Sequence, residues 1–186
     1  MAVQIGAKPL ADFDRPIDML MDCHRRVEHF LELFINVEAL YRGKPLDDEA
    51  LRGLRSAQTY FRTSAPKHTA DEESSLFPRL KSQLPAGNPT LDALQKLEAD
   101  HRWAEELHAR IDATVDVWCA SPEKLLPINQ SHRLRQDLLR LKEHYTEHIR
   151  LEEQDVFPLA AQHLSPEYIS EIGSEMRNRR QARSHT

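Results

Sequence analysis

The sequence predicts an all-α protein: an antiparallel, up-down four-helix bundle with a short C-terminal helix. Three observations carry this prediction. Apolar residues recur every three or four positions over long stretches, as on the buried face of a helix. Only 5 of the 186 residues are glycine, and the many Leu, Glu, Arg and Ala residues favour helices over turn-rich β structure. Proline and glycine cluster between four long segments, and long helices joined by short loops pack as an antiparallel bundle.

Each expected helix has its own boundary signals. We expect helices over residues 14–43, over 47 or 48 to 83, over 90–120 with Thr90 as N-cap, and over 131–163. Pro66 should kink or restart the second helix one turn before His68. A short fifth helix follows Pro166 and ends in a basic run, interpreted as a solvated helix end rather than a binding patch: Arg177, Arg179, Arg180 and Arg183.

Composition limits the classes of function. The chain divides into an extension (1–13), the bundle (14–163) and a short helix with a tail (164–186). A net charge of −5 gives no basic excess for nucleic acid. No stretch approaches the ~20 apolar residues of a membrane span, and the N-terminus does not resemble a signal peptide. Two cysteines cannot build a disulfide framework, so we expect a cytoplasmic protein.

An internal repeat marks the candidate site. Residues 68–78 and 148–158 share the pattern H-x-x-x-E-E-x-x-φ-F-P, where φ is apolar. Each copy begins with a His and a Glu four residues later, which lie on one face of a helix. The first and third helices each carry one further His on the apolar stripe, at His24 and His101. The chain therefore resembles two helical hairpins of related design.

The stripes predict that six polar side chains from four helices meet inside the bundle: His24, His68, Glu72, His101, His148 and Glu152. Burying such groups without partners would cost several kcal/mol per charge. Imidazole and carboxylate ligands suit Fe, Mn or Zn, and bundle cores hold such metals. The alternative is a metal-free bundle in which the same side chains form hydrogen-bonded pairs.

This order of motifs resembles the hemerythrin-like, HHE cation-binding domain over about residues 14–163. The resemblance implies a non-haem diiron centre, with His24, His68, His101 and His148 as terminal ligands. Glu72 and Glu152 would bridge the two metals. Two iron ions are the cofactor expected, although Mn or Zn could be held by the same ligands.

The chain departs from the oxygen-carrying hemerythrins at two positions. Glu105 stands four residues after His101, where those proteins have a second His. The oxygen-carrying proteins also have an Asp five residues after the last His, whereas in this chain Glu152 lies four residues after His148. These departures resemble the bacterial branch of the family, which includes proteins linked to repair of damaged iron centres.

Four further residues leave two interpretations open. Glu105 is either a seventh ligand or a solvated side chain, and His144 either binds metal or lies around the ligands. Glu73 and Glu153 either accept hydrogen bonds from the ligand imidazoles or are surface charges.

Three functions fit the sequence. The first is a diiron protein that interacts with O₂, NO or peroxide in sensing, scavenging or iron handling. The second is a diiron enzyme that reduces peroxide or NO, or repairs iron centres. The third is a metal-free helical bundle with a regulatory or structural role. Any protein partner is left open.

Overall fold

A computed structural model describes residues 12–181, and this part of the chain is helical without a β-strand. The helices are α1 Pro16–Tyr41, α2 Asp48–Thr63, α3 Ala65–Asp71, α4 Phe77–Gln83, α5 Pro89–Ala120, α6 Ile128–Leu151, α7 Phe157–His163 and α8 Pro166–Gln181. Two π-helical turns, η1 Glu72–Leu76 and η2 Glu152–Val156, join α3 to α4 and α6 to α7. Most of the predicted N-terminal extension (1–11) and the end of the tail, with Arg183, lie outside the described residues.

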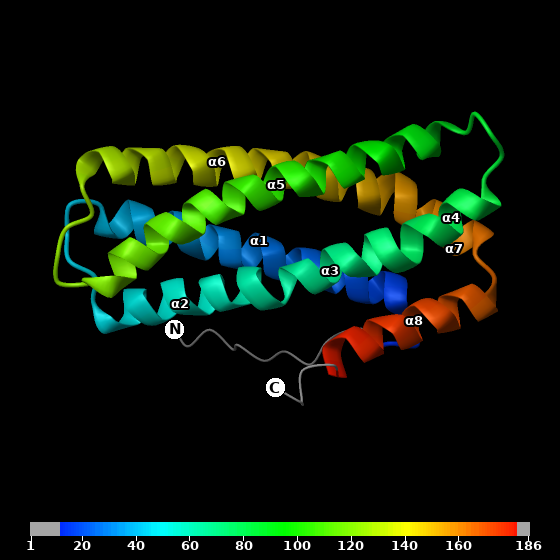
Figure 1. Ribbon diagram of the computed structural model, residues 1–186, viewed down its shortest axis with the longest axis horizontal. Helices are drawn as coiled ribbons and strands as arrows, with labels where there is room; N and C mark the ends of the chain where they lie inside the picture. The colour runs from blue at the N-terminus through cyan, green and yellow to red at the C-terminus, as the bar shows by residue number, and fades with distance from the viewer. Residues whose placement is uncertain (1–11, 182–186) are drawn as a thin grey trace.

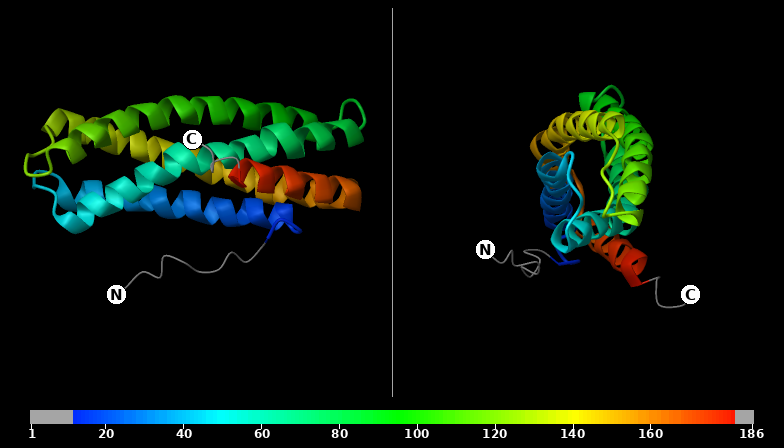
Figure 2. Two further views of the ribbon diagram at one scale, coloured as in Figure 1. Left: turned by 60° about the horizontal axis from the view of Figure 1, so that its bottom comes forward. Right: turned by 90° about the vertical axis from the view of Figure 1, so that its left-hand side faces the viewer.

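Four long rods form the bundle (Figure 1). They are α1, the chain from α2 to α4, α5, and the chain from α6 to α7. Neighbouring rods pack α1 on α2, α2 on α5, α5 on α6 and α6 on α1, and the end-on view in Figure 2 shows them around one axis with α8 outside. The predicted fold class is therefore confirmed.

The helix boundaries follow local chemistry, with two differences from expectation. Asp47 caps α2 through its side chain, which accepts a hydrogen bond from Ala50 N at 2.8 Å. The predicted cap at Thr90 is wrong, because Asn88 caps α5 and accepts from the Thr90 amide at 2.9 Å. Helix α6 begins at Ile128, directly after Pro127.

The rods that carry the repeat are interrupted helices. Pro66 restarts the second rod as predicted, since Ser64 separates α2 from α3. The expected continuous α-helix after His68 is wrong, however, because one π-turn follows each His-x-x-x-Glu pair. Proline cannot donate to the carbonyl four residues back and its ring crowds that carbonyl. A wider turn before Pro78 and before Pro158 relieves both problems, and π-turns of this kind are frequent at functional sites.

A polar layer separates two apolar cores along the bundle. One core lies toward the α1–α2 and α5–α6 loops and includes Leu31, Phe34, Ile111, Trp118 and Leu138. The other lies toward α4 and α7 and includes Leu20, Phe77, Leu94, Phe157 and Met176. The six candidate metal ligands lie between these cores, so the site is a cross-section of the bundle.

Helix α8 is anchored to the outside of this polar layer. Asp71, 0% exposed, accepts hydrogen bonds from Arg179 (2.5 Å) and Arg180 (2.6 Å). Arg179 also donates to the Ser75 hydroxyl in η1. The interpretation of the basic run as a solvated helix end is therefore wrong for these two residues, because the run neutralises a buried carboxylate next to Glu72.

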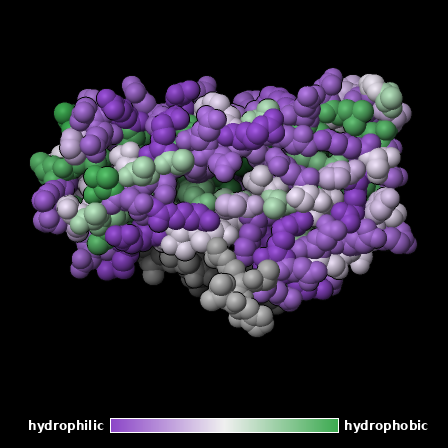
Figure 3. All heavy atoms as spheres, in the orientation of Figure 1, coloured by the Kyte–Doolittle hydropathy of each residue, from purple (hydrophilic) through white to green (hydrophobic). Residues whose placement is uncertain are grey.

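Polar residues predominate on the face shown in Figure 3, with apolar side chains gathered toward the two ends of the bundle. In the described part of the chain, no helix is long and apolar enough to cross a membrane.

Glycine is required where α8 meets the start of the chain. A Cβ at Gly173 would lie 1.8 Å from the carbonyl oxygen of Phe13. We expect Gly173→Ala to displace α8 and lower the free energy of unfolding by about 1–3 kcal/mol, as measured by urea denaturation. Gly53→Ala is the control, because its Cβ meets Leu33 at an ordinary 3.5 Å and alanine favours the helix by up to about 1 kcal/mol. Equal effects of both substitutions would contradict this packing.

Glu38 ties α1 to α6 and makes stability depend on pH. The buried carboxylate accepts hydrogen bonds from Arg42 (2.9 Å), Ser131 (2.8 Å) and Arg135 (3.3 Å). Burial would raise the pKa of Glu38, but these hydrogen bonds outweigh it and lower the pKa below its ordinary value. A lowered folded-state pKa contributes stability above the unfolded pKa, and that stability is lost as pH falls through the folded pKa.

We therefore expect Glu38→Gln to cost about 1–3 kcal/mol at neutral pH. The difference from wild type should shrink between about pH 5 and pH 3. Urea denaturation across this range measures both effects, with exposed Glu147→Gln as control. Parallel stability curves for wild type and Glu38→Gln would contradict the assignment.

Candidate metal centre

The structure brings the six predicted ligands together. His24 comes from α1, His68 and Glu72 from the second rod, His101 from α5, and His148 and Glu152 from the fourth rod. His24, Glu72 and Glu152 are at most 1% exposed, and the other three side chains are at most 9% exposed. These six side chains meet inside the bundle because each lies on the apolar stripe of its helix.

The four imidazoles form two pairs. The rings of His24 and His68 have centroids 4.9 Å apart, and those of His101 and His148 are 4.7 Å apart. In every case the Nε2 atom faces the carboxylates of the cluster. Each pair therefore presents two nitrogen donors to one side of the polar layer.

Each carboxylate reaches both histidine pairs. In Glu72, Oε1 lies 3.3 Å from His68 Nε2 and 3.8 Å from His24 Nε2, whereas Oε2 lies 3.3 Å from His101 Nε2. In Glu152, Oε2 lies 3.0 Å from His24 Nε2 and Oε1 lies 3.3 Å from His148 Nε2. Every pair of imidazoles is thus matched by one oxygen from each carboxylate.

These inward-facing atoms lack hydrogen-bond partners. Among the described residues, His24 Nε2 and all four oxygens of Glu72 and Glu152 are buried without a hydrogen bond. Leaving such groups unsatisfied is costly in a low-dielectric core. Donors about 2.1 Å from a common metal ion lie about 3 Å from one another, close to the separations seen here. The donor set and its spacing fit metal binding.

The electrostatics of the layer require positive charge. Burial would raise the pKa of Glu72, but the neighbouring imidazoles outweigh this and hold that pKa well below its ordinary value. Burial would lower the pKa of His24, yet the nearby carboxylates of Glu152 and Glu72 and the hydrogen bond to Glu153 raise that pKa instead. The carboxylates therefore remain ionised, and either imidazolium protons or metal cations must balance them.

Two outer carboxylates orient two of the histidines. His24 Nδ1–H donates to Glu153 Oε1 at 2.9 Å, and His101 Nδ1–H donates to Glu73 Oε1 at 2.8 Å. Of the two interpretations left open for Glu73 and Glu153, the structure shows the hydrogen bonds to the imidazoles. Such bonds leave Nε2 free to bind a metal and raise the basicity of the ring.

The phenylalanines of the repeat support the same two histidines. Phe157 stacks on His24 with ring centroids 5.5 Å apart and planes at 11°. Phe77 lies parallel to His101 at 6.4 Å and 5°. Each copy of the repeat thus braces a histidine that belongs to a different rod.

The two remaining candidates lie outside the six-residue cluster. Glu105 is exposed and lines a pocket beside His101. His144 is half-buried, and its Nε2–H donates to the carbonyl oxygen of Asp100 at 3.2 Å. Whether either residue binds metal stays a prediction, although both positions suit residues around the ligands.

Sequence reasoning gave no role to Asp100. Its carboxylate lies 3.6 Å from His148 Nδ1, and Asp100, His144 and His148 form a group that could itself hold a metal ion. The signal available was its position directly before His101. Asp100 lies on the outer side of His148, where it can orient that ring.

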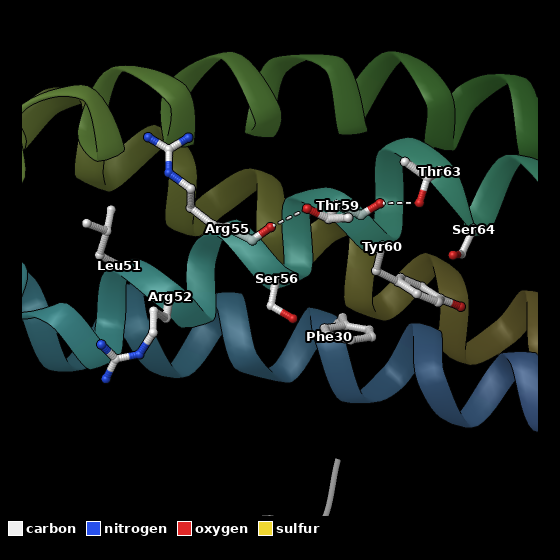
Figure 4. A pocket seen from close by; sticks show the side chains of 9 residues that line it. All are labelled: Phe30, Leu51, Arg52, Arg55, Ser56, Thr59, Tyr60, Thr63 and Ser64. Atoms are coloured by element: carbon white, nitrogen blue, oxygen red, sulfur yellow. Dashed lines mark hydrogen bonds between the residues drawn. The ribbon is translucent and has the colours of Figure 1, made fainter. Parts of the chain in front are cut away.

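A wider surface hollow lies away from the histidines. It has a volume of about 650 Å³ and runs along α1 and α2 (Figure 4), past Arg55, Thr59 and Thr63. Thr59 and Thr63 donate their hydroxyl hydrogens to backbone carbonyls one turn earlier, so these hydroxyls have no hydrogen left to donate to a ligand. The hollow contains none of the six candidate ligands.

Comparison with known families agrees with this geometry. The profile described as hemerythrin HHE cation-binding domain matches residues 15–160. The chain belongs to this hemerythrin family. It is also 27% identical over 173 residues to an uncharacterized protein of Haemophilus influenzae, covering 93% of this chain and 94% of that protein.

Membership of a cation-binding family and a buried cluster of histidine and glutamate side chains make this hemerythrin-type chain a metal-binding protein. Within residues 12–181, three groups of histidine, glutamate and aspartate side chains could hold an ion: His24–His68–Glu72, His101–His148–Glu152 and the Asp100 group. Two of the three groups thus coincide with the two halves of the cluster.

The outer carboxylates provide a test of the site. We expect Glu73→Ala and Glu153→Ala each to weaken metal binding by about 10- to 100-fold, because a ligand histidine loses its orienting partner. Competition with a chromogenic chelator measures the affinity. Glu73→Gln and Glu153→Gln should restore part of it, since the amide oxygen still accepts a hydrogen bond. Exposed Glu147→Ala is the control, and an equal affinity in all variants would contradict the orienting role.

Proposed function

We propose that this protein holds two iron ions and interacts there with O₂, NO or peroxide, in sensing, scavenging or iron handling. The observation that carries the proposal is the position of Glu72 and Glu152, each with one oxygen toward each histidine pair. Carboxylates so placed between two sets of imidazoles suit a pair of cations better than a single one.

The ligands divide evenly between the two ions. His24 and His68 would hold one iron, His101 and His148 the other, and Glu72 and Glu152 would bridge them. These six side chains would supply few donors for two ions, so a small molecule could bind beside them. When bound, a diiron pair supplies reversible ligand binding and electron exchange.

The protein's own side chains control this chemistry. Glu73 and Glu153 fix the orientation of two imidazoles, and the two apolar cores on either side of the layer exclude bulk water. The proposal includes a cytoplasmic location, which the buried free thiols of Cys23 and Cys119 support.

Metal content is the first test. Protein purified without a metal-affinity tag should contain about two irons per chain by elemental analysis, with charge-transfer absorption in the near ultraviolet. Removal of iron should lower the melting temperature, because a ligand that binds only the folded state stabilises it by about 2.7 kcal/mol at 100 times its Kd.

The double variant Glu72→Ala, Glu152→Ala should lose both the iron and the absorption. Glu143→Ala, Glu147→Ala on exposed positions of α6 is the matched control and should keep them. If metal-free protein takes up no ferrous iron under anaerobic conditions and its melting temperature does not change, the metal-free bundle is the better account.

A further inference from the structure

A pocket of about 270 Å³ opens on one side of the polar layer. It lies where the break between α2 and α3 faces α5 and α6. Its walls include Phe61, Pro66, Thr69, His101, His108 and Tyr145. Ala65 and Pro66, at the start of α3, both line it, so the pocket lies at the helix break that this proline marks.

A smaller cavity lies at the inner end of this pocket. It has a volume of about 20 Å³ and is lined by all four candidate histidines, whereas Glu72 and Glu152 do not line it. Ala65, Thr69, His101 and Tyr145 line both the pocket and the cavity. A volume of 10–15 Å³ is about the minimum for one water molecule, so the cavity accepts a ligand of very few atoms.

A hydrogen-bonded pair stands where the two spaces meet. The Tyr145 hydroxyl and His108 Nε2 lie 2.9 Å apart. His108 packs against Phe61 with ring centroids 4.4 Å apart, so its ring is held between Phe61 and Tyr145. Burial lowers the pKa of His108 to about 4, so the imidazole is neutral and can either donate to or accept from the phenol.

We infer that small molecules reach the metal centre through this pocket, and that the Tyr145 hydroxyl, positioned by His108, hydrogen-bonds to the molecule bound in the inner cavity. The inference rests on the proposed diiron function and adds to it the route and the group that holds the ligand. The ligand class is a molecule of two or three heavy atoms with a hydrogen-bond acceptor, such as a diatomic gas, peroxide or azide.

Described side chains cover the layer on two further sides. Phe77 and Phe157, at most 1% exposed, cover the ligands toward the second core. On the α1 side, Glu153 forms hydrogen bonds with both His24 and Arg25, and His24 is 1% exposed. The hollow in Figure 4 reaches the end of α2 at Tyr60, Thr63 and Ser64. It has no lining residue in common with the pocket or with the inner cavity.

The test separates the route from the hydrogen bond by kinetics. Azide binding to the iron-loaded protein is followed by stopped-flow absorption, with the iron content of every variant measured in parallel. Tyr145→Phe should raise the azide dissociation rate by about three- to tenfold, the value of one lost hydrogen bond, with little change in association. His108→Phe should give a smaller increase, because the phenol loses its positioning partner.

A plug in the route should act differently. Ala65→Leu narrows the junction between pocket and cavity, so association and dissociation should slow together while the Kd for azide is unchanged. Thr69→Leu narrows the same junction from the next turn of α3 and replaces Ala65→Leu if that variant does not fold. Ser56→Leu, in the hollow of Figure 4, is the matched control and should leave both rates at the wild-type value.

The outcomes distinguish this inference from the proposed function. Wild-type protein without iron would overturn the diiron proposal itself. Variants that contain two irons but bind azide at wild-type rates would overturn only the route and the role of Tyr145. Slowing by Ser56→Leu but not by Ala65→Leu or Thr69→Leu would place the route on the other side of α2.

Discussion

The structure depends on a buried layer of charge between two apolar cores. Two carboxylates at 0% exposure face four imidazoles, and their oxygens have no hydrogen bonds within the described residues. A layer of this composition weakens the bundle unless cations balance it. The rest of the fold serves to hold this layer in register, because each rod contributes at least one of its members.

The repeat explains how the layer is held. Within each copy, the first His and the first Glu enter the cluster, while the second Glu and the Phe reach across to a histidine of another rod. Glu153 and Phe157 thus support His24, and Glu73 and Phe77 support His101. The two hairpins brace each other, so neither half forms a complete site alone. Helix α8 breaks this symmetry by anchoring only the first copy, through Asp71.

Much of this arrangement could be predicted from the sequence, because the spacing of apolar residues along the chain determines which face of each helix is buried. The apolar stripes correctly placed all six ligand candidates inside, whereas the role of Glu73 and Glu153 was left open between hydrogen bonding and surface charge. Features that depend on distant contacts could not be predicted. The π-turns arise from the strain of Pro78 and Pro158 on the preceding turn, and Asp71 is neutralised by arginines more than 100 residues away. The pairing of His108 with Tyr145 likewise needs the spatial register of α5 against α6.

Anomalous scattering at the iron absorption edge, from crystals of the iron-loaded protein, tests the central claim most directly. The account predicts two peaks in the polar layer. One lies between the Nε2 atoms of His24 and His68, the other between those of His101 and His148, and each is near one oxygen of Glu72 and of Glu152. A single peak, or one at Asp100 and His144 in place of the layer, would contradict it.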